Sequence, residues 1–162
     1  MQQFTKKSIT VSDVIKKMEY YCAYQERCHY DIEIKLKKYH LIPQAKEKVI
    51  LHLREHNFLN EERFAKSFAS GKFSIKKWGR LRIINALKFR QISNYLINEA
   101  LSEISEQRYL DTFDEIPEKK WHSLQELDPL QKKKKMLSFL AYRGWEFQLI
   151  NAKINQLTKN KY

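Results

Sequence analysis

The chain has 162 residues and a net charge of +12, because 31 residues are Lys or Arg and only 19 are Asp or Glu. This balance favours a polyanionic partner, such as a nucleic acid, an acidic protein surface or an anionic membrane, over a role in solubility alone. The three Gly and three Pro are too few for a turn-rich β protein, whereas an apolar share of 43% suffices to bury a core.

The sequence also bears on the compartment. No run approaches the roughly 18 uninterrupted apolar residues of a membrane span. The first ten residues lack the apolar stretch of a secretory signal peptide. The two cysteines, Cys22 and Cys28, are typical of reduced thiols. We therefore predict a cytoplasmic protein with no membrane partner.

Three helices are predicted in the first third of the chain. Thr10 and Asp13 form the pattern of a capping box at the start of the first helix. The second begins at Cys28, where Asp31 is placed to bond back to the backbone. Pro43 suits the first turn of the third, because its missing N–H would be unpaired there anyway.

Three more helices are predicted in the middle third. Asn60 is a good N-cap for the first of them. Gly71 and Ser74 are expected to loosen the chain after this helix. A further helix is expected from Gly79, and Ser93 is placed to cap the one that follows.

The last third is less regular. Pro117 lies within an otherwise helical pattern, so we expect a break or kink there. Asp128 followed by Pro129 predicts a clean helix start. Gly144 predicts the end of that helix, and a ninth helix follows it. The tail from Lys159 to Tyr162 is expected to fray.

These helices repeat as three units. Leu36, Leu87 and Leu140 occupy equivalent positions, with apolar residues at matching offsets, and lie 51 and 53 residues apart (87 − 36 and 140 − 87). A fixed period in this range indicates an array of supersecondary units. We predict an all-α fold, a tandem array of three three-helix units with about nine helices. The predicted units are residues 1–57, 58–105 and 106–162.

The charge is concentrated in the middle unit, where no acidic residue occurs between Glu62 and Glu99. A solvated helix face normally mixes signs, so this bias predicts contact with a polyanion. A second basic run, at residues 132–135, is equally consistent with a solvated surface, because four consecutive lysines cannot share one side of a helix. The predicted binding residues are Arg63, Lys72, Lys76, Lys77, Arg80, Arg82, Lys88, Arg90, Lys132, Lys133, Lys134, Lys135 and Arg143.

Catalytic and metal chemistry find little support. His52 and His56 have a spacing that can bind a metal, but no second ligand pair accompanies them. Tyr20, Tyr21 and Tyr24 could stack on bases, although their helical spacing is more typical of the core and its margin. No glycine-rich phosphate loop is present. We predict no enzyme activity, no cofactor and no metal site.

Two stretches carry a family resemblance. The middle unit contains Phe58-Leu59-Asn60-Glu61-Glu62-Arg63-Phe64-Ala65, then Lys72, Lys77-Trp78-Gly79-Arg80-Leu81-Arg82-Ile83 and Ala86-Leu87. The third unit contains Phe139-Leu140-Ala141-Tyr142-Arg143-Gly144-Trp145, with Ile150 after it. These motifs, together with the threefold repeat, resemble the RecX family of recombination regulators from about Val11 to Leu157.

The resemblance implies an elongated, curved helical array that modulates the RecA recombinase. Proteins of this kind lie in the groove of the filament that RecA forms on single-stranded DNA, and they restrain its extension, ATPase and strand exchange. Arg63, Lys72, Lys77, Arg80 and Arg82 would then face the filament or its DNA. The residues expected to fix the fold of the middle unit are Phe64, Ala65, Trp78 and Gly79. We expect a monomer.

Two alternatives remain open at this stage. A direct DNA-binding protein could present a helix-turn-helix, although a sequence-specific reader would concentrate Arg, Asn and Gln on one recognition helix. Lys and Arg are instead spread over several units, which favours contact with a backbone or a filament. A helical scaffold for acidic proteins is the other alternative, and it predicts no effect of single-stranded DNA on partner binding.

Overall fold

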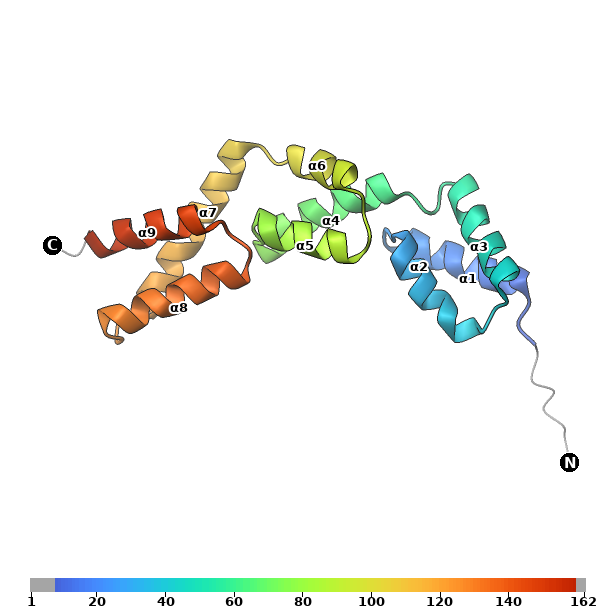
Figure 1. Ribbon diagram of the computed structural model, residues 1–162, viewed down its shortest axis with the longest axis horizontal. Helices are drawn as coiled ribbons and strands as arrows, with labels where there is room; N and C mark the ends of the chain where they lie inside the picture. The colour runs from blue at the N-terminus through green and yellow to red at the C-terminus, as the bar shows by residue number, and fades with distance from the viewer. Residues whose placement is uncertain (1–7, 160–162) are drawn as a thin grey trace, which may run out of the picture. The chain divides into compact units, whose positions relative to one another are not determined.

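The computed structural model describes residues 8–159, and within this range it contains nine α-helices, one 3₁₀-helix and no strand (Figure 1). The elements are α1 (Val11–Tyr24), α2 (His29–Leu36), η1 (Lys37–Tyr39), α3 (Pro43–Glu55), α4 (Glu61–Lys76), α5 (Arg80–Phe89), α6 (Asn94–Ser102), α7 (Glu106–Ser123), α8 (Pro129–Tyr142) and α9 (Phe147–Lys159). The predicted all-α class and the predicted series of helices are confirmed. The part of the tail predicted to fray at residues 160–162 lies outside the described residues.

The helix starts follow the predicted capping chemistry. The Thr10 hydroxyl accepts the Asp13 N–H, and the Asp13 carboxylate accepts the Thr10 N–H in return. Ser93 caps α6 by accepting the Leu96 N–H, and Asp128 caps α8 by accepting the Leu130 N–H. These side chains accept hydrogen bonds from backbone N–H groups that have no partner inside the helix, which explains why the helices begin there.

The chain divides into two compact units, one up to Phe64 and one from Ala65. In the first unit α1 packs against α3, and α2 packs against α3. Its core holds Val14 and Met18 from α1, Ile32 from α2 and Leu53 from α3, all at most 1% exposed. These apolar residues recur at helical spacing, so each helix buries a single stripe.

The second unit contains α5 to α9 and most of α4. An aromatic cluster lies at its centre, where Phe73 of α4 stacks on Tyr109 of α7 with ring centroids 5.8 Å apart. Trp145, between α8 and α9, lies 4.7 Å from Tyr109 and 5.1 Å from Phe113. Rings from the second and third predicted units therefore share one core.

Neither of two predicted interruptions breaks a helix. Helix α7 continues through Pro117, although proline removes one backbone hydrogen bond. Pro117 is buried with Tyr109, Phe113 and Trp121 on one face of the helix, and this packing offsets the lost bond. Likewise α4 continues through Gly71 and Ser74, because one glycine in a helix interior costs only about 1 kcal/mol.

Candidate functional site

The Trp78-Gly79-Arg80 motif joins α5 to the end of α8. The Gly79 N–H donates to the Arg143 carbonyl at 2.8 Å, and the Leu81 N–H donates to the Gly144 carbonyl at 3.1 Å. The first turn of one helix thus finds its missing acceptors at the last turn of another. Both glycines are needed for this approach, because a Cβ on Gly79 would lie 2.3 Å from the Gly144 oxygen, and one on Gly144 would lie 2.3 Å from the Arg82 nitrogen.

Arg80 belongs to a polar network around the buried Tyr109. Its guanidinium pairs with Glu106 and lies 3.7 Å from Glu146. Its backbone N–H donates to the Tyr109 hydroxyl at 3.0 Å, and that hydroxyl donates to Glu146 at 2.7 Å. Burial, reinforced by the hydrogen bond to Glu146, raises the pKa of Tyr109. Arg80 therefore connects α5 with α7 and the start of α9, and its charge is compensated locally.

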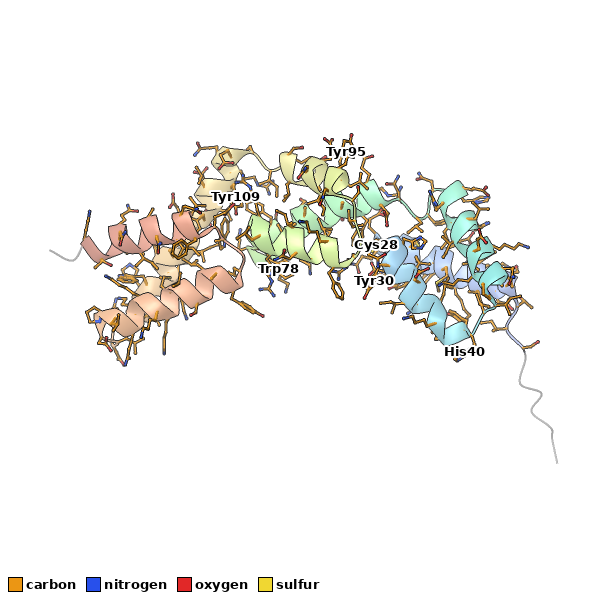
Figure 2. All side chains as sticks on the ribbon, viewed as in Figure 1. Cys28, Tyr30, His40, Trp78, Tyr95 and Tyr109 are labelled. Atoms are coloured by element: carbon orange, nitrogen blue, oxygen red, sulfur yellow. The ribbon has the colours of Figure 1, made fainter. Side chains whose placement is uncertain are left out.

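A row of alternating cations and aromatic rings runs across the second unit; we call it the cation–aromatic row. In order it contains Arg90, Phe68, Lys72, Trp78, Arg82 and Tyr142. The distances from cation to ring centroid run from 4.1 Å for Arg82 over Trp78 to 5.3 Å for Lys72 over Phe68. A cation–π contact of this kind orients the cation and does not itself remove its charge. Figure 2 labels Trp78, its central ring.

The other predicted residues of the middle unit are more exposed. Lys76 and Lys88 are exposed, and Lys77 is half-buried with a left-handed backbone, φ 55°. Arg82 also donates to the Tyr142 carbonyl at 2.9 Å. Lys72, Arg82 and Arg90 thus lie together in the cation–aromatic row, whereas Arg80 faces the network around Tyr109.

The lysine run of α8 is divided between interior and surface. Lys132 is only 2% exposed, and its ammonium lies 4.2 Å from the centre of the Trp121 ring. Lys134 and Lys135 are exposed, and Lys133 is half-buried. The helical turn of about 100° per residue separates these positions, so the burial of Lys132 disagrees with its predicted surface role. Arg143 lies over the Phe139 ring at 4.0 Å.

Arg63 belongs to the first unit and is held within it. Its Nε donates to Glu26 at 2.6 Å, and its terminal nitrogens donate to the side chain and the carbonyl of Asn57 at 3.1 and 3.0 Å. These bonds connect the start of α4 with the end of α1 and with the turn after α3. The structure therefore gives this predicted binding residue a packing role.

Sequence reasoning missed several partners of the basic residues. Glu106, Tyr109 and Glu146 had no assigned role, because their pairing with Arg80 spans 26 to 66 residues. Lys153 was also missed. It is 6% exposed and donates to Asp114 at 3.1 Å and to Glu118 at 3.2 Å. Burial alone would lower the pKa of Lys153, but these two hydrogen bonds outweigh it and raise the pKa.

His52 and His56 lie at the end of α3. His52 stacks on His56 with ring centroids 4.0 Å apart and lies 2.7 Å from the Glu19 carboxylate. No group of three or more potential metal ligands occurs within the part of the chain that the structure describes. None of the helices in residues 8–159 is both long enough and apolar enough to cross a bilayer.

Two family models match the chain. Residues 60–101 match the model described as RecX, second three-helix domain, and residues 107–154 match that described as RecX, third three-helix domain. Together they cover more than half of the sequence. The two matches correspond closely to α4–α6 and α7–α9.

Individual relatives agree with these models. The regulatory protein RecX of Chlorobaculum tepidum is 31% identical over 120 residues, which are 74% of this chain and 72% of that protein. Those of Clostridium perfringens and Lactobacillus johnsonii are 29% and 25% identical, over 72% and 94% of this chain. The chain spans 55% and 56% of the length of these last two relatives.

A solved structure supports the fold. The crystal structure of RecX from Lactobacillus salivarius is similar to this chain with a TM-score of 0.75 at 19% sequence identity. The similarity covers 91% of this chain and 96% of that one. This agreement confirms the prediction of tandem three-helix units.

Proposed function

This chain belongs to the RecX family of regulatory proteins, and on that premise we propose that it binds the filament of RecA on single-stranded DNA and restrains its extension, ATPase and strand exchange. The observation that carries the proposal is the electropositive surface of the second unit. All members of the cation–aromatic row except Tyr142 lie in the window without acidic residues, residues 63–98.

Exposed lysines add to the positive charge of the second unit. Lys76 and Lys88 belong to the acid-free window, and Lys134 and Lys135 lie on α8. Lysines of this kind suit phosphate oxygens, which they contact as mobile point charges without reading the base sequence. We propose that they meet the DNA backbone or acidic residues of the filament.

Packing roles reduce the predicted contact set. Arg63, Arg80 and Lys132 are engaged within the protein, so we remove them from the proposed binding surface. The residues that remain are Lys72, Lys76, Lys77, Arg82, Lys88, Arg90, Lys133, Lys134, Lys135 and Arg143. This set includes the whole cationic part of the cation–aromatic row.

A regulatory role is also consistent with the side chains that the fold brings together. The polar network around Tyr109 joins helices, and its hydroxyl and carboxylates are engaged with Arg80 and with one another. We propose that the protein acts by occupying the filament and not by chemistry of its own. Direct, sequence-independent DNA binding is the second candidate, and the same lysines support it.

Binding measurements distinguish the two. Fluorescence anisotropy of labelled single-stranded DNA is measured bare and as a preformed RecA–ATP filament, each at two salt concentrations. Substantially tighter binding to the filament, with slower ATP hydrolysis, is the expected result. Equal or weaker binding to the filament, with a steep salt dependence on bare DNA, would refute the filament role and favour plain DNA binding.

A matched pair of variants tests the surface itself. Lys76→Gln with Lys88→Gln removes two exposed charges from the acid-free window, whereas Lys48→Gln with Arg54→Gln removes two exposed charges from α3. If each lysine contacts one phosphate, the first pair of substitutions makes the negative slope of log binding constant against log salt concentration shallower by about 1.4. The α3 pair is expected to leave the slope unchanged. Equal effects of both pairs would show that net charge alone matters.

A further inference from the structure

The first unit carries a groove of about 440 Å³ between α1 and the α2–η1 segment. Its tyrosines and lysines are Tyr20, Tyr21, Tyr24, Tyr39, Lys16, Lys17, Lys35 and Lys38. We propose that this tyrosine–lysine groove binds single-stranded nucleic acid, with bases stacked on the exposed tyrosine rings and phosphates against the lysines. The groove lies in the first unit, whereas the proposed filament-binding surface lies in the second.

Two of the tyrosines are far more exposed than packing requires. Tyr20 and Tyr24 are 75% and 77% exposed. Tyr21, between them in sequence, instead packs against the core of the unit. Their spacing of four residues places Tyr20 and Tyr24 one above the other on α1, where two rings can receive successive bases. Since the core does not use these rings, the expectation that they lie at its margin is wrong for this pair.

The charges of the same helices are segregated. From Val11 to Tyr39 the chain has six basic and five acidic residues, so this segment is almost neutral. Four of the six basic residues line the groove, and none of its described lining residues is acidic. The result is a positive strip on an otherwise balanced segment, which is the charge complement of a phosphate backbone.

The acidic residues of this segment are occupied elsewhere. Asp13 and Asp31 cap α1 and α2. Glu19 lies 2.7 Å from His52, Glu26 accepts from Arg63, and Glu33 pairs with Lys46 at 3.0 Å. Each of the five acids thus has a partner that is not a groove lysine.

Aromatic rings hold part of the positive charge in place. Lys35 lies 4.7 Å from the centre of the Tyr21 ring, and Lys38 lies 4.8 Å from that of Tyr39. These contacts position both ammonium groups beside the groove while leaving their charge intact. A flexible anionic chain would thus meet a partly ordered set of cations.

The combination points to a single strand. In a duplex the base faces are already stacked on one another, so exposed tyrosines gain little from it. An acidic protein would engage the lysines but has no bases for the tyrosine faces. Unpaired bases joined by phosphates use both components, and stacking tolerates any base because every base has a π-face.

The test is binding of the full chain to labelled oligothymidylate and to an abasic strand of equal length. Tyr20→Ala with Tyr24→Ala is expected to weaken oligothymidylate binding at least about tenfold, because two stacking rings are removed. The same variant is expected to bind the abasic strand as the wild type does. Tyr20→Phe with Tyr24→Phe keeps the stacking faces and is expected to bind normally.

Two controls separate this site from the second unit. Tyr95→Ala removes a comparably exposed ring, 71% exposed, from α6 (Figure 2), and is expected to have no effect. Photocrosslinking of 5-iodouracil strands, followed by peptide mapping, is expected to label Tyr20 or Tyr24. Crosslinks confined to residues 65–162, or an equal loss of binding to the abasic strand, would overturn the proposal.

Two further ligands complete the test. Tighter binding to oligouridylate than to oligothymidylate would support the single-strand site and assign RNA as its ligand. Displacement of the oligonucleotide by polyglutamate at equal charge concentration would overturn it in favour of an acidic protein. Because no RecA is present, failure of these tests leaves the proposed filament role unaffected, and failure of the filament assay leaves this site unaffected.

Discussion

Replacing Gly79 with alanine tests whether the contact between α5 and the end of α8 holds the second unit together. The backbone of Gly79 has φ −76° and ψ 169°, which alanine adopts without strain. In an open position the substitution would therefore stabilise the protein by about 0.4–1 kcal/mol, because alanine restricts the unfolded chain. The sign of the effect depends on the neighbouring backbone.

The neighbouring backbone leaves no room for a methyl group. The added Cβ would lie 2.3 Å from the Gly144 oxygen, 2.5 Å from its carbonyl carbon and 2.6 Å from the Trp145 nitrogen. These are backbone atoms, so α5 must move away and strain its hydrogen bonds to Arg143 and Gly144. Two such bonds contribute about 1 kcal/mol each, and more if their groups stay buried without partners. We expect a net destabilisation of about 2–4 kcal/mol.

Urea unfolding followed by tryptophan fluorescence measures this, because Trp78, Trp121 and Trp145 all lie in the second unit. Gly71→Ala is the matched control. Apart from its chain neighbours and the backbone of its own helix α4, no atom lies within 4 Å of a Cβ built on Gly71, so we expect Gly71→Ala to stabilise the protein by about 0.5–1 kcal/mol. Equal stability of the two variants would refute the argument that close backbone approach selects glycine at position 79.

Three other predictions concern buried groups. Tyr109→Phe removes one accepted and one donated hydrogen bond and should cost about 2 kcal/mol, measured by the same urea unfolding; an unchanged midpoint would exclude the network as a stabilising element. The pKa of Lys153 is higher in the folded protein than the value of about 10.4 for a lysine in the unfolded chain. Its ion pairs therefore stabilise the fold fully below about pH 10.4, and this stabilisation is lost as the pH rises through the pKa of the folded protein. The stability difference between wild type and Lys153→Met should therefore shrink above about pH 10.4, and a constant difference would contradict this. Burial raises the pKa of Cys22 to about 11, so iodoacetamide at pH 8 should label this thiol only after unfolding; rapid labelling of the native protein would contradict its buried position.

Much of the local structure was predictable because it depends on residues close in sequence. Thr10 with Asp13, Ser93, and Asp128 with Pro129 satisfy helix starts through side chains within three positions. The continuation of α7 through Pro117 was not predictable for the same reason. Sequence rules for helices consider only the N–H that proline lacks. They do not consider that Pro117 and Trp121 are buried on one face of α7, which depends on packing against other helices.

The candidate site was predictable in composition but not in detail. The acid-free window is visible in the sequence, and the structure shows that Lys76 and Lys88 are exposed within it. Arg80 pairs with Glu106 and Glu146, however, and such partners lie far along the chain. Counting charges along the sequence therefore does not reveal these ion pairs.

The sequence alone determined the helices, their order and the family, because caps and apolar periodicity act over a few residues and the family motifs are contiguous. Only the tertiary structure decided which basic and aromatic side chains face solvent. Lys132 lies against Trp121 and Arg63 is bonded to Glu26, whereas Tyr20 and Tyr24 are exposed on α1. The physical reason is that exposure and pairing depend on contacts between helices, which bring together residues separated by tens of positions.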